Sequence, residues 1–283
     1  MSLMQEILAK VEELPPLPGV AQQILTMVQD PEFSFQALME TVRLDPGITA
    51  NVLKMANSAF FGLRRRVASL DQALQFLGTN NLLEIVLSSQ LMRFYADGQA
   101  GYQLSRGELW HHSMAVALLA QRLGEQLRFP QKPTLFTAAL LHDVGKLVLS
   151  EFVSQDFALI EELVRNEGIS FVEAERQVLG LDHAVLGGVV ARHWNFPEDI
   201  VNGIAFHHHA ERTTRHRELT AMVALANLVV IMWGGAAGAE GLSARVPEGL
   251  LRIVGLKTRD LDLLGLEVKD ILDQADDLLN LGR

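Results

Sequence analysis

The chain has 283 residues, of which 49% are hydrophobic, and its formal net charge is −10. This length and apolar content allow a sizeable core and exclude an intrinsically disordered chain. An acidic surface repels phosphate backbones, so a general nucleic-acid binder is disfavoured. The absence of cysteine excludes disulfides and thiolate metal sites, and any metal must therefore have nitrogen and oxygen ligands. It also fits a reducing compartment, and charged side chains near the N-terminus leave no apolar signal sequence, so we expect a cytoplasmic location.

Helices are predicted throughout the first hundred residues, because apolar residues recur at spacings of three and four and no stretch alternates as a strand does. Three side chains that can accept hydrogen bonds from a first helical turn are predicted N-caps: Ser34, Asp45 and Ser69. Pro46 suits the first position of the helix after Asp45. Gly78 is expected to end one helix, and a longer one should run to about Tyr95.

The segment 96–101 is a predicted boundary, because it contains two glycines and an aspartate. All nine histidines follow it, between His111 and His216. We therefore predict an all-α fold of two helical lobes, residues 1–100 and 101–240. Residues 241–283 read as a helical tail packed on the second lobe.

One stretch in the second lobe, from Ala221 to Ala239, is uncharged over 19 residues, near the minimum length for a membrane span. It contains Asn227 and several glycines, and it lacks flanking basic clusters. A helix buried within the protein is the favoured interpretation, without membrane association.

The second lobe also contains the candidate metal ligands. They are Glu108, His112, His142, Asp143, His183, His207 and His208. Glu108 and His112 are four residues apart and share one helix face. His142 and Asp143 read as part of an apolar helix, and His183 heads another helix. A buried carboxylate beside histidines is costly unless a cation compensates it, so this pattern favours a divalent ion.

Structural roles are the alternatives for several of these residues. Ser105 and Glu108 have capping-box spacing, so Glu108 could serve only its own helix N-terminus. A single histidine such as His183 is more often structural than a ligand. Three consecutive histidines cannot all face inward, and His209 is expected at the surface. His111 points away from His112 and is also expected in solvent.

Ordered motifs in the first lobe resemble the HDOD domain family. They are 14–19 (LPPLPG), 44–50 (LDPGITA), 53–62 (LKMANSAFFG), 69–73 (SLDQA) and 76–78 (FLG). The resemblance covers roughly residues 5 to 215. It implies a helical bacterial signalling module related to the HD phosphohydrolases and often described as non-enzymatic. The first lobe would then be an HDOD-type bundle and the second an HD-domain-like bundle.

Residues 142–146 (HDVGK) resemble the signature of the HD superfamily, and the HD-GYP phosphodiesterases offer the closest ligand pattern. By that resemblance the five histidines and Asp143 bind one or two divalent transition ions (Fe, Mn, Zn or Ni), with Glu108 as an additional ligand. Asp143 and Lys146 are the candidate catalytic residues. Lys146 would lie beside a substrate phosphate, and its alternative is a salt bridge to Asp143.

Two departures from that pattern stand out. The last ligand of the superfamily is an aspartate, whereas the matching position here is Asn227, which binds metal more weakly. The residues after His209 also lack the glycine-tyrosine-proline loop of the cyclic-dinucleotide enzymes. Specific hydrolysis of such a dinucleotide is therefore disfavoured.

Three functions are consistent with these residues. The preferred one is a signalling or scaffold module that binds a protein partner and retains a structural or sensory metal site. The alternative is a metal-dependent phosphohydrolase, in which Lys146 offsets developing charge. A redox or gas sensor is a weaker third. Phe60 and Phe61 would fill the core or line a partner groove, and apolar surface on the tail could support a homodimer.

Overall fold

The computed structural model describes residues 3–29, 34–58, 61–63, 65–95, 97–234 and 245–281. Every regular element within these ranges is a helix, apart from one isolated bridge between Gln99 and Leu104. The predicted all-α class is therefore confirmed. No helix in the described part of the chain is long and apolar enough to cross a membrane.

The first helices are α1 (Leu3–Glu12), α2 (Gly19–Gln29), α3 (Phe35–Leu44), α4 (Pro46–Ala56) and α5 (Leu70–Leu91). The three predicted N-caps are confirmed, since the side chains of Ser34, Asp45 and Ser69 accept from backbone N–H groups of the following turns. Gly78 ends one helical stretch as expected. With a φ of 78° its backbone is non-helical, and α5 consists of two helices that meet at this kink. The Asn81 amide donates to the Leu77 carbonyl across this kink.

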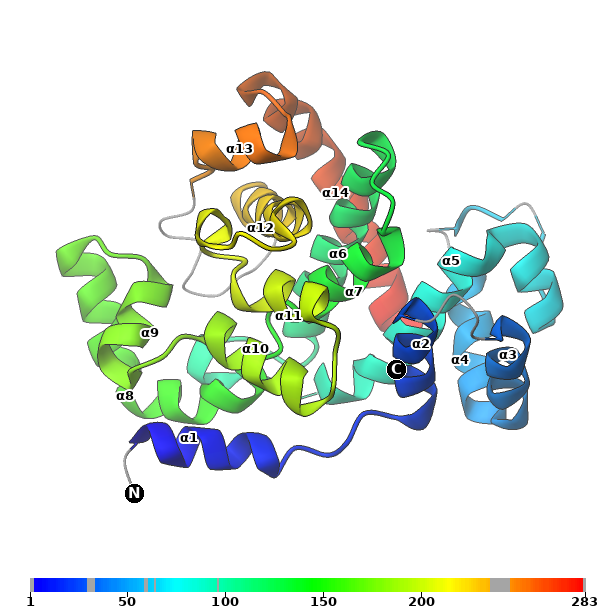
Figure 1. Cartoon of the computed structure of the whole chain (residues 1–283), viewed down its shortest axis with the longest axis horizontal. Coiled ribbons are helices and arrows are strands. Elements are labelled where there is room, and N and C mark those ends of the chain that lie inside the picture. The colour runs from blue at the N-terminus through cyan, green and yellow to red at the C-terminus, as the bar shows by residue number, and fades with distance from the viewer. Residues whose placement is uncertain are drawn as a thin grey trace.

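The remaining elements follow a short 3₁₀ segment, η2 (Met92–Tyr95). They are η3 (Ala100–Tyr102), α6 (Glu108–Gln126), α7 (Lys132–Leu141), α8 (Lys146–Glu167), α9 (Phe171–Leu179), α10 (His183–His193), α11 (Glu198–Ala205), η4 (Ala210–Arg212), α12 (Arg217–Met232), α13 (Glu248–Val254) and α14 (Thr258–Leu281). Helix α6 is central and packs against α7, α12 and α14, while α1 lies along α8 and α10 (Figure 1). Because α6 is covered on several sides, its apolar residues extend around most of its circumference.

A single apolar core runs through the chain, from Ile7 on α1 to Leu278 on α14. Helix α14 contacts both α6 and α4, and α13 packs on α12. The core is thus continuous across the expected boundaries, and the division into lobes at 100/101 and 240/241 stays a prediction.

Other expectations for this part of the chain have mixed outcomes. Helix α12 covers most of the uncharged stretch and is buried as predicted, whereas residues 235–239 lie outside the described residues. Phe61 packs against the core, and Phe60 lies outside the described residues. The expectation that His111 is solvated is wrong. Its Nε2 lies 3.1 Å from the Leu272 carbonyl oxygen, because α14 covers this face of α6.

Candidate metal centre

Asp143 is the fully buried centre of the histidine cluster. Its Oδ2 lies 3.7 Å from Nε2 of His112 and 3.3 Å from Nε2 of His142. Its Oδ1 lies 3.3 Å from Nε2 of His183 and 3.8 Å from Nε2 of His207. We call His112, His142 and Asp143 the aspartate triad, and His183, His207 and His208 the histidine triad. The potential ligand atoms within each triad all lie within 4.8 Å of one another.

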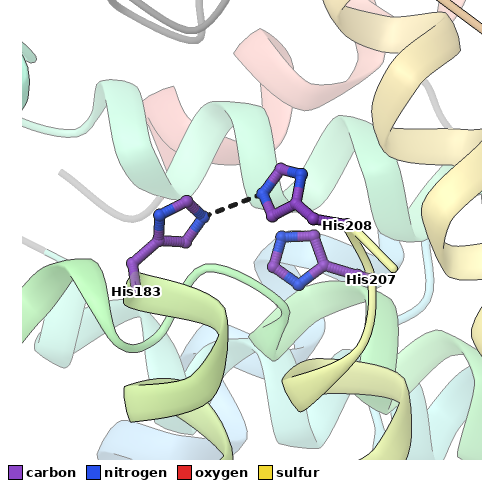
Figure 2. A group of neighbouring side chains, drawn as sticks. All are labelled: His183, His207 and His208. Carbon is purple, nitrogen blue, oxygen red and sulfur yellow. Dashed lines mark hydrogen bonds between the residues drawn. The ribbon is translucent and has the colours of Figure 1, made fainter. Parts of the chain in front are cut away.

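The histidine triad joins two segments that are distant in sequence (Figure 2). His183 is the first residue of α10, whose N-terminus is capped by the Asp182 side chain. His207 and His208 come from the turn after α11, which ends at Ala205, two residues before His207. The Nε2 atoms of His183 and His208 are 3.0 Å apart. The short α11 therefore directs two imidazoles toward the start of α10.

Asp143 lies in a turn, and the expectation that His142 and Asp143 belong to a helix is wrong. Helix α7 ends at Leu141 and α8 begins at Lys146, so residues 142–145 connect them. The reason is a close approach to α10. A Cβ built on Gly145 would lie 2.0 Å from the His183 carbonyl oxygen, so only glycine fits there. This contact places His183 beside Asp143.

Backbone carbonyls orient two of the imidazoles. Nδ1 of His142 lies 2.7 Å from the Ala139 oxygen, and Nδ1 of His207 lies 2.7 Å from the Ile204 oxygen. A carbonyl oxygen can only accept, so each Nδ1 carries the hydrogen. In a neutral ring the lone pair is then on Nε2, which faces Asp143. This orientation is typical of metal-ligating histidines.

Glu175 orients His183, and sequence reasoning missed it. The Glu175 carboxylate accepts from the backbone N–H of His183 at 3.1 Å and lies 2.8 Å from His183 Nδ1. It also accepts from the Tyr102 hydroxyl. Glu175 is fully buried on α9, on the same face as Phe171 and Leu179. A carboxylate within an apolar helical stripe was the available signal.

Burial keeps three of these histidines, His112, His207 and His208, in the neutral form that binds metal. It lowers the pKa of His112 to about 3 and holds the pKa of His207 and His208 well below the ordinary value. The Asp143 carboxyl group, in contrast, is kept in its charged form. Burial pushes the pKa of Asp143 upward, but His142 and the Lys146 ammonium outweigh it and hold that pKa well below its ordinary value. Neutral imidazoles around a carboxylate are the donor set that a divalent cation requires.

Several of these buried atoms have no hydrogen-bond partner in the described part of the chain. They are Nδ1 of His112, Nε2 of His142, Oδ1 of Asp143 and Nε2 of His207. Buried polar atoms are normally paired, and lone pairs that face one another repel unless a proton or cation lies between them. The residues therefore fit a divalent metal ion, which would supply the missing partner to several atoms at once.

Lys146, a predicted catalytic residue, is fully buried. Its Nζ donates to Oδ2 of Asp143 at 2.8 Å and lies 5.3 Å from the centre of the Tyr102 ring. This is the salt bridge considered as its alternative role. The pair places the Lys146 ammonium directly beside the centre of the cluster.

Two residues define the edges of the site. Glu108 belongs to neither triad. Its Oε2 accepts from the Ser105 backbone N–H at 2.6 Å, in the segment before α6, whose N-cap is Gly107 and not Ser105. Asn227 does face the cluster. It is buried on α12, and its Oδ1 lies 3.0 Å from His112 Nε2. An amide therefore lies next to His112, and the match of Asn227 to the aspartate of the superfamily pattern stays a prediction.

An all-helical fold with a buried histidine-aspartate cluster defines the class of HD-like proteins. The HDOD domain family matches residues 14–210, and the chain belongs to this family. An HDOD domain protein of unknown function from Geobacter sulfurreducens has a similar structure, at 26% identity and a TM-score of 0.79, over 98% of this chain and 97% of that one. A candidate phosphohydrolase from Shewanella amazonensis SB2B is similar at 25% identity and a TM-score of 0.73, over 98% of both chains.

Two further similarities extend to longer proteins. A candidate signal transduction protein from Marinobacter aquaeolei VT8 shares the fold at 22% identity and a TM-score of 0.73, over all of this chain and 61% of that one. An uncharacterised protein from Treponema pallidum is 23% identical over 257 residues, which are 88% of this chain and 47% of that protein. The chain thus spans about half the length of this curated relative.

Proposed function

We propose that the chain is an HDOD signalling module that holds at least one divalent transition-metal ion. The observation that carries this proposal is the set of imidazole nitrogens around Asp143, of which Nε2 of His142 and Nε2 of His207 are buried without a hydrogen-bond partner in the described part of the chain. Nitrogen and oxygen donors of this kind suit iron, manganese, zinc or nickel.

The histidine triad is the stronger candidate for a single ion. It offers three imidazoles near Oδ1 of Asp143. The Glu175 carboxylate contacts Nδ1 of His183, whereas Nε2 of the same ring faces Asp143. A carboxylate behind a ligating histidine raises its basicity and fixes its orientation. The aspartate triad has the neutral Asn227 as its neighbour and would hold a second ion more weakly.

In this proposal the module binds a protein partner and does not bind nucleic acid. The net charge of −10 disfavours phosphate backbones, and family membership together with the name of the Marinobacter relative supports a signalling role. A homodimer would use the exposed Leu263 and Leu266 of α14.

The second candidate is a metal-dependent phosphohydrolase, which the name of the Shewanella relative suggests. Bound ions would supply Lewis-acid chemistry to a phosphoryl group. Lys146 would keep a positive charge beside Asp143 where negative charge develops. The His183 ring would be held in one orientation by Glu175.

Elemental analysis of protein purified without chelator tests the main proposal. We expect at least one transition-metal ion per chain, retained in His193→Ala, whose histidine is exposed and outside both triads, and lost in His183→Ala. Absence of metal from the unmodified protein would contradict the proposal. Turnover of bis-nitrophenyl phosphate that disappears in Asp143→Ala would promote the phosphohydrolase instead.

A further inference from the structure

A cavity of about 470 Å³ adjoins the histidine triad. His207 and His208 line its inner end, and its walls come from the start of α9, from α12 and from α13 with the residues before it. The Nε2 atom of His207 is buried, faces Asp143 and has no hydrogen-bond partner within the described residues, so this imidazole lies between the cavity and the centre of the cluster. The volume falls within the range of small-molecule sites.

The walls of this cavity are mostly apolar. Phe171 of α9, Leu228 of α12 and Ile253 of α13 are among the apolar lining residues, and η4 contributes Ala210 and Glu211. Arg245, which is exposed, is the one lysine or arginine among the described lining residues. A ligand with several phosphates would need more cationic partners than this lining offers. Glu211 also lines the cavity, but its exposed carboxylate pairs with His209 and Arg212. An apolar body with a single anionic head matches the walls, and Arg245 can pair with the head during entry.

We propose that the cavity binds an amphipathic anion with one head group, a carboxylate or a phosphate, toward the histidine triad and its hydrocarbon part along α12 and α13. The proposal rests on the metal-binding function above, because an oxygen anion is a suitable ligand for an ion held by imidazoles. In a signalling module such a ligand would be the input. In a phosphohydrolase it would be the monoester of an apolar alcohol.

Calorimetric titration of the metal-loaded full chain tests this inference. The ligands are alkyl phosphates and alkyl carboxylates of increasing length, with decanol as the uncharged control, all below micelle-forming concentrations. Affinity should rise about three- to fourfold per added methylene until the cavity is filled, because each buried methylene leaves water. Decanol should bind at least about tenfold more weakly than the better anion, since it lacks the charged head. The better of the two series identifies the head group.

A matched pair of variants locates the binding. Leu228→Trp fills part of the cavity and should end the chain-length dependence at a shorter ligand. Met232→Trp adds the same bulk at an exposed position near the end of α12, outside the lining, and should change nothing. The same length dependence in both variants would overturn the inference, as would equal affinity for decanol or for inorganic phosphate. Elemental analysis of each sample separates these results from failure of the metal proposal, which would show as a chain without metal.

Discussion

The helices before η2 and the helices from α6 to α12 differ in how their buried polar side chains are paired. In the first region, the Asn57 side chain bonds the Leu53 carbonyl and both backbone groups of Val67, which ties the end of α4 to the segment before α5. Glu84 on α5 receives a hydrogen bond from Gln121 on α6. In the second region, the polar groups around Asp143 converge and several have no protein partner.

This difference indicates that buried polar groups of the first region stabilise the fold, whereas those around Asp143 serve to bind a ligand. Unpartnered buried atoms also occur on Gln23 and Ser58, but neither belongs to a metal-like group in the described residues. Leaving a buried polar group unsatisfied costs about 1–3 kcal/mol, so a cluster of such groups is tolerated when a ligand supplies the partner. We therefore expect substitutions in the first region to change folding stability and those around Asp143 to change metal content.

Asp143→Asn should have the largest effect. It removes the carboxylate that lies between the two triads, with Oδ2 toward His142 and Oδ1 toward His183, and we expect metal content to fall to background at both sites. Lys146 would also lose its charged partner, at a cost of roughly 3–5 kcal/mol as for other buried ion pairs. Elemental analysis and urea unfolding measure the two effects. Retention of a full ion by this variant would show that the cluster does not depend on Asp143.

Glu84→Gln tests the first region through pH. Burial, assisted by Glu125, raises the pKa of Glu84 from 4.5 to about 8. Between those values the folded chain keeps a proton that the unfolded chain has released, so stability falls as pH rises through this window. The variant lacks this loss, so its free energy of unfolding should rise by roughly 4 kcal/mol relative to that of the wild type between about pH 5 and about pH 8.5.

Urea unfolding at the two pH values measures this gain. Glu167→Gln, at an exposed position near the end of α8, is the control and should follow the wild type. Metal content should be unchanged in both variants. Parallel pH profiles for Glu84→Gln and the wild type would show that Glu84 is ionised in the folded chain.

Glu175→Gln should weaken metal binding about 10- to 100-fold, the usual range for the carboxylate behind a ligating histidine. The amide keeps the shape and can still accept one hydrogen bond, so the fold should persist. Competition with a chelator measures the affinity. Tyr102→Phe removes only the hydroxyl contact to Glu175 and should have a smaller effect. Unchanged affinity in Glu175→Gln would make Glu175 a purely structural residue.

Asn227→Asp should have the smallest effect and the opposite sign. A carboxylate next to His112 would strengthen the aspartate triad, and we expect about tenfold tighter binding of a second ion. The measurement is the metal-to-protein ratio at increasing metal concentration. If the ratio stays at the wild-type value throughout, Asn227 does not limit the second ion.

Local sequence patterns predicted much of this fold. The N-caps at Ser34, Asp45 and Ser69 follow from side-chain chemistry within one turn, and these expectations are confirmed. Proximity of the distant histidines followed from the family resemblance, because spacing alone cannot bring His112 near His207. The turn at 142–145 was missed because its cause is a tertiary contact between Gly145 and the start of α10.

Side-chain partners across the core were also beyond local patterns. Glu175 lies on a different helix from His183, and Tyr102 reaches it from η3. The cavity depends on how α9, α12 and α13 pack together, and no single segment encodes it. The contact of His111 with α14 has the same origin.

Anomalous diffraction from crystals of protein purified without chelator tests the central claim most directly. We predict a transition-metal peak within bonding distance, about 2.0–2.2 Å, of imidazole nitrogens of the histidine triad and an oxygen of Asp143. A weaker peak, or none, is expected at the aspartate triad. Crystals of fully metal-supplemented protein without any anomalous peak among His183, His207, His208 and Asp143 would contradict the claim.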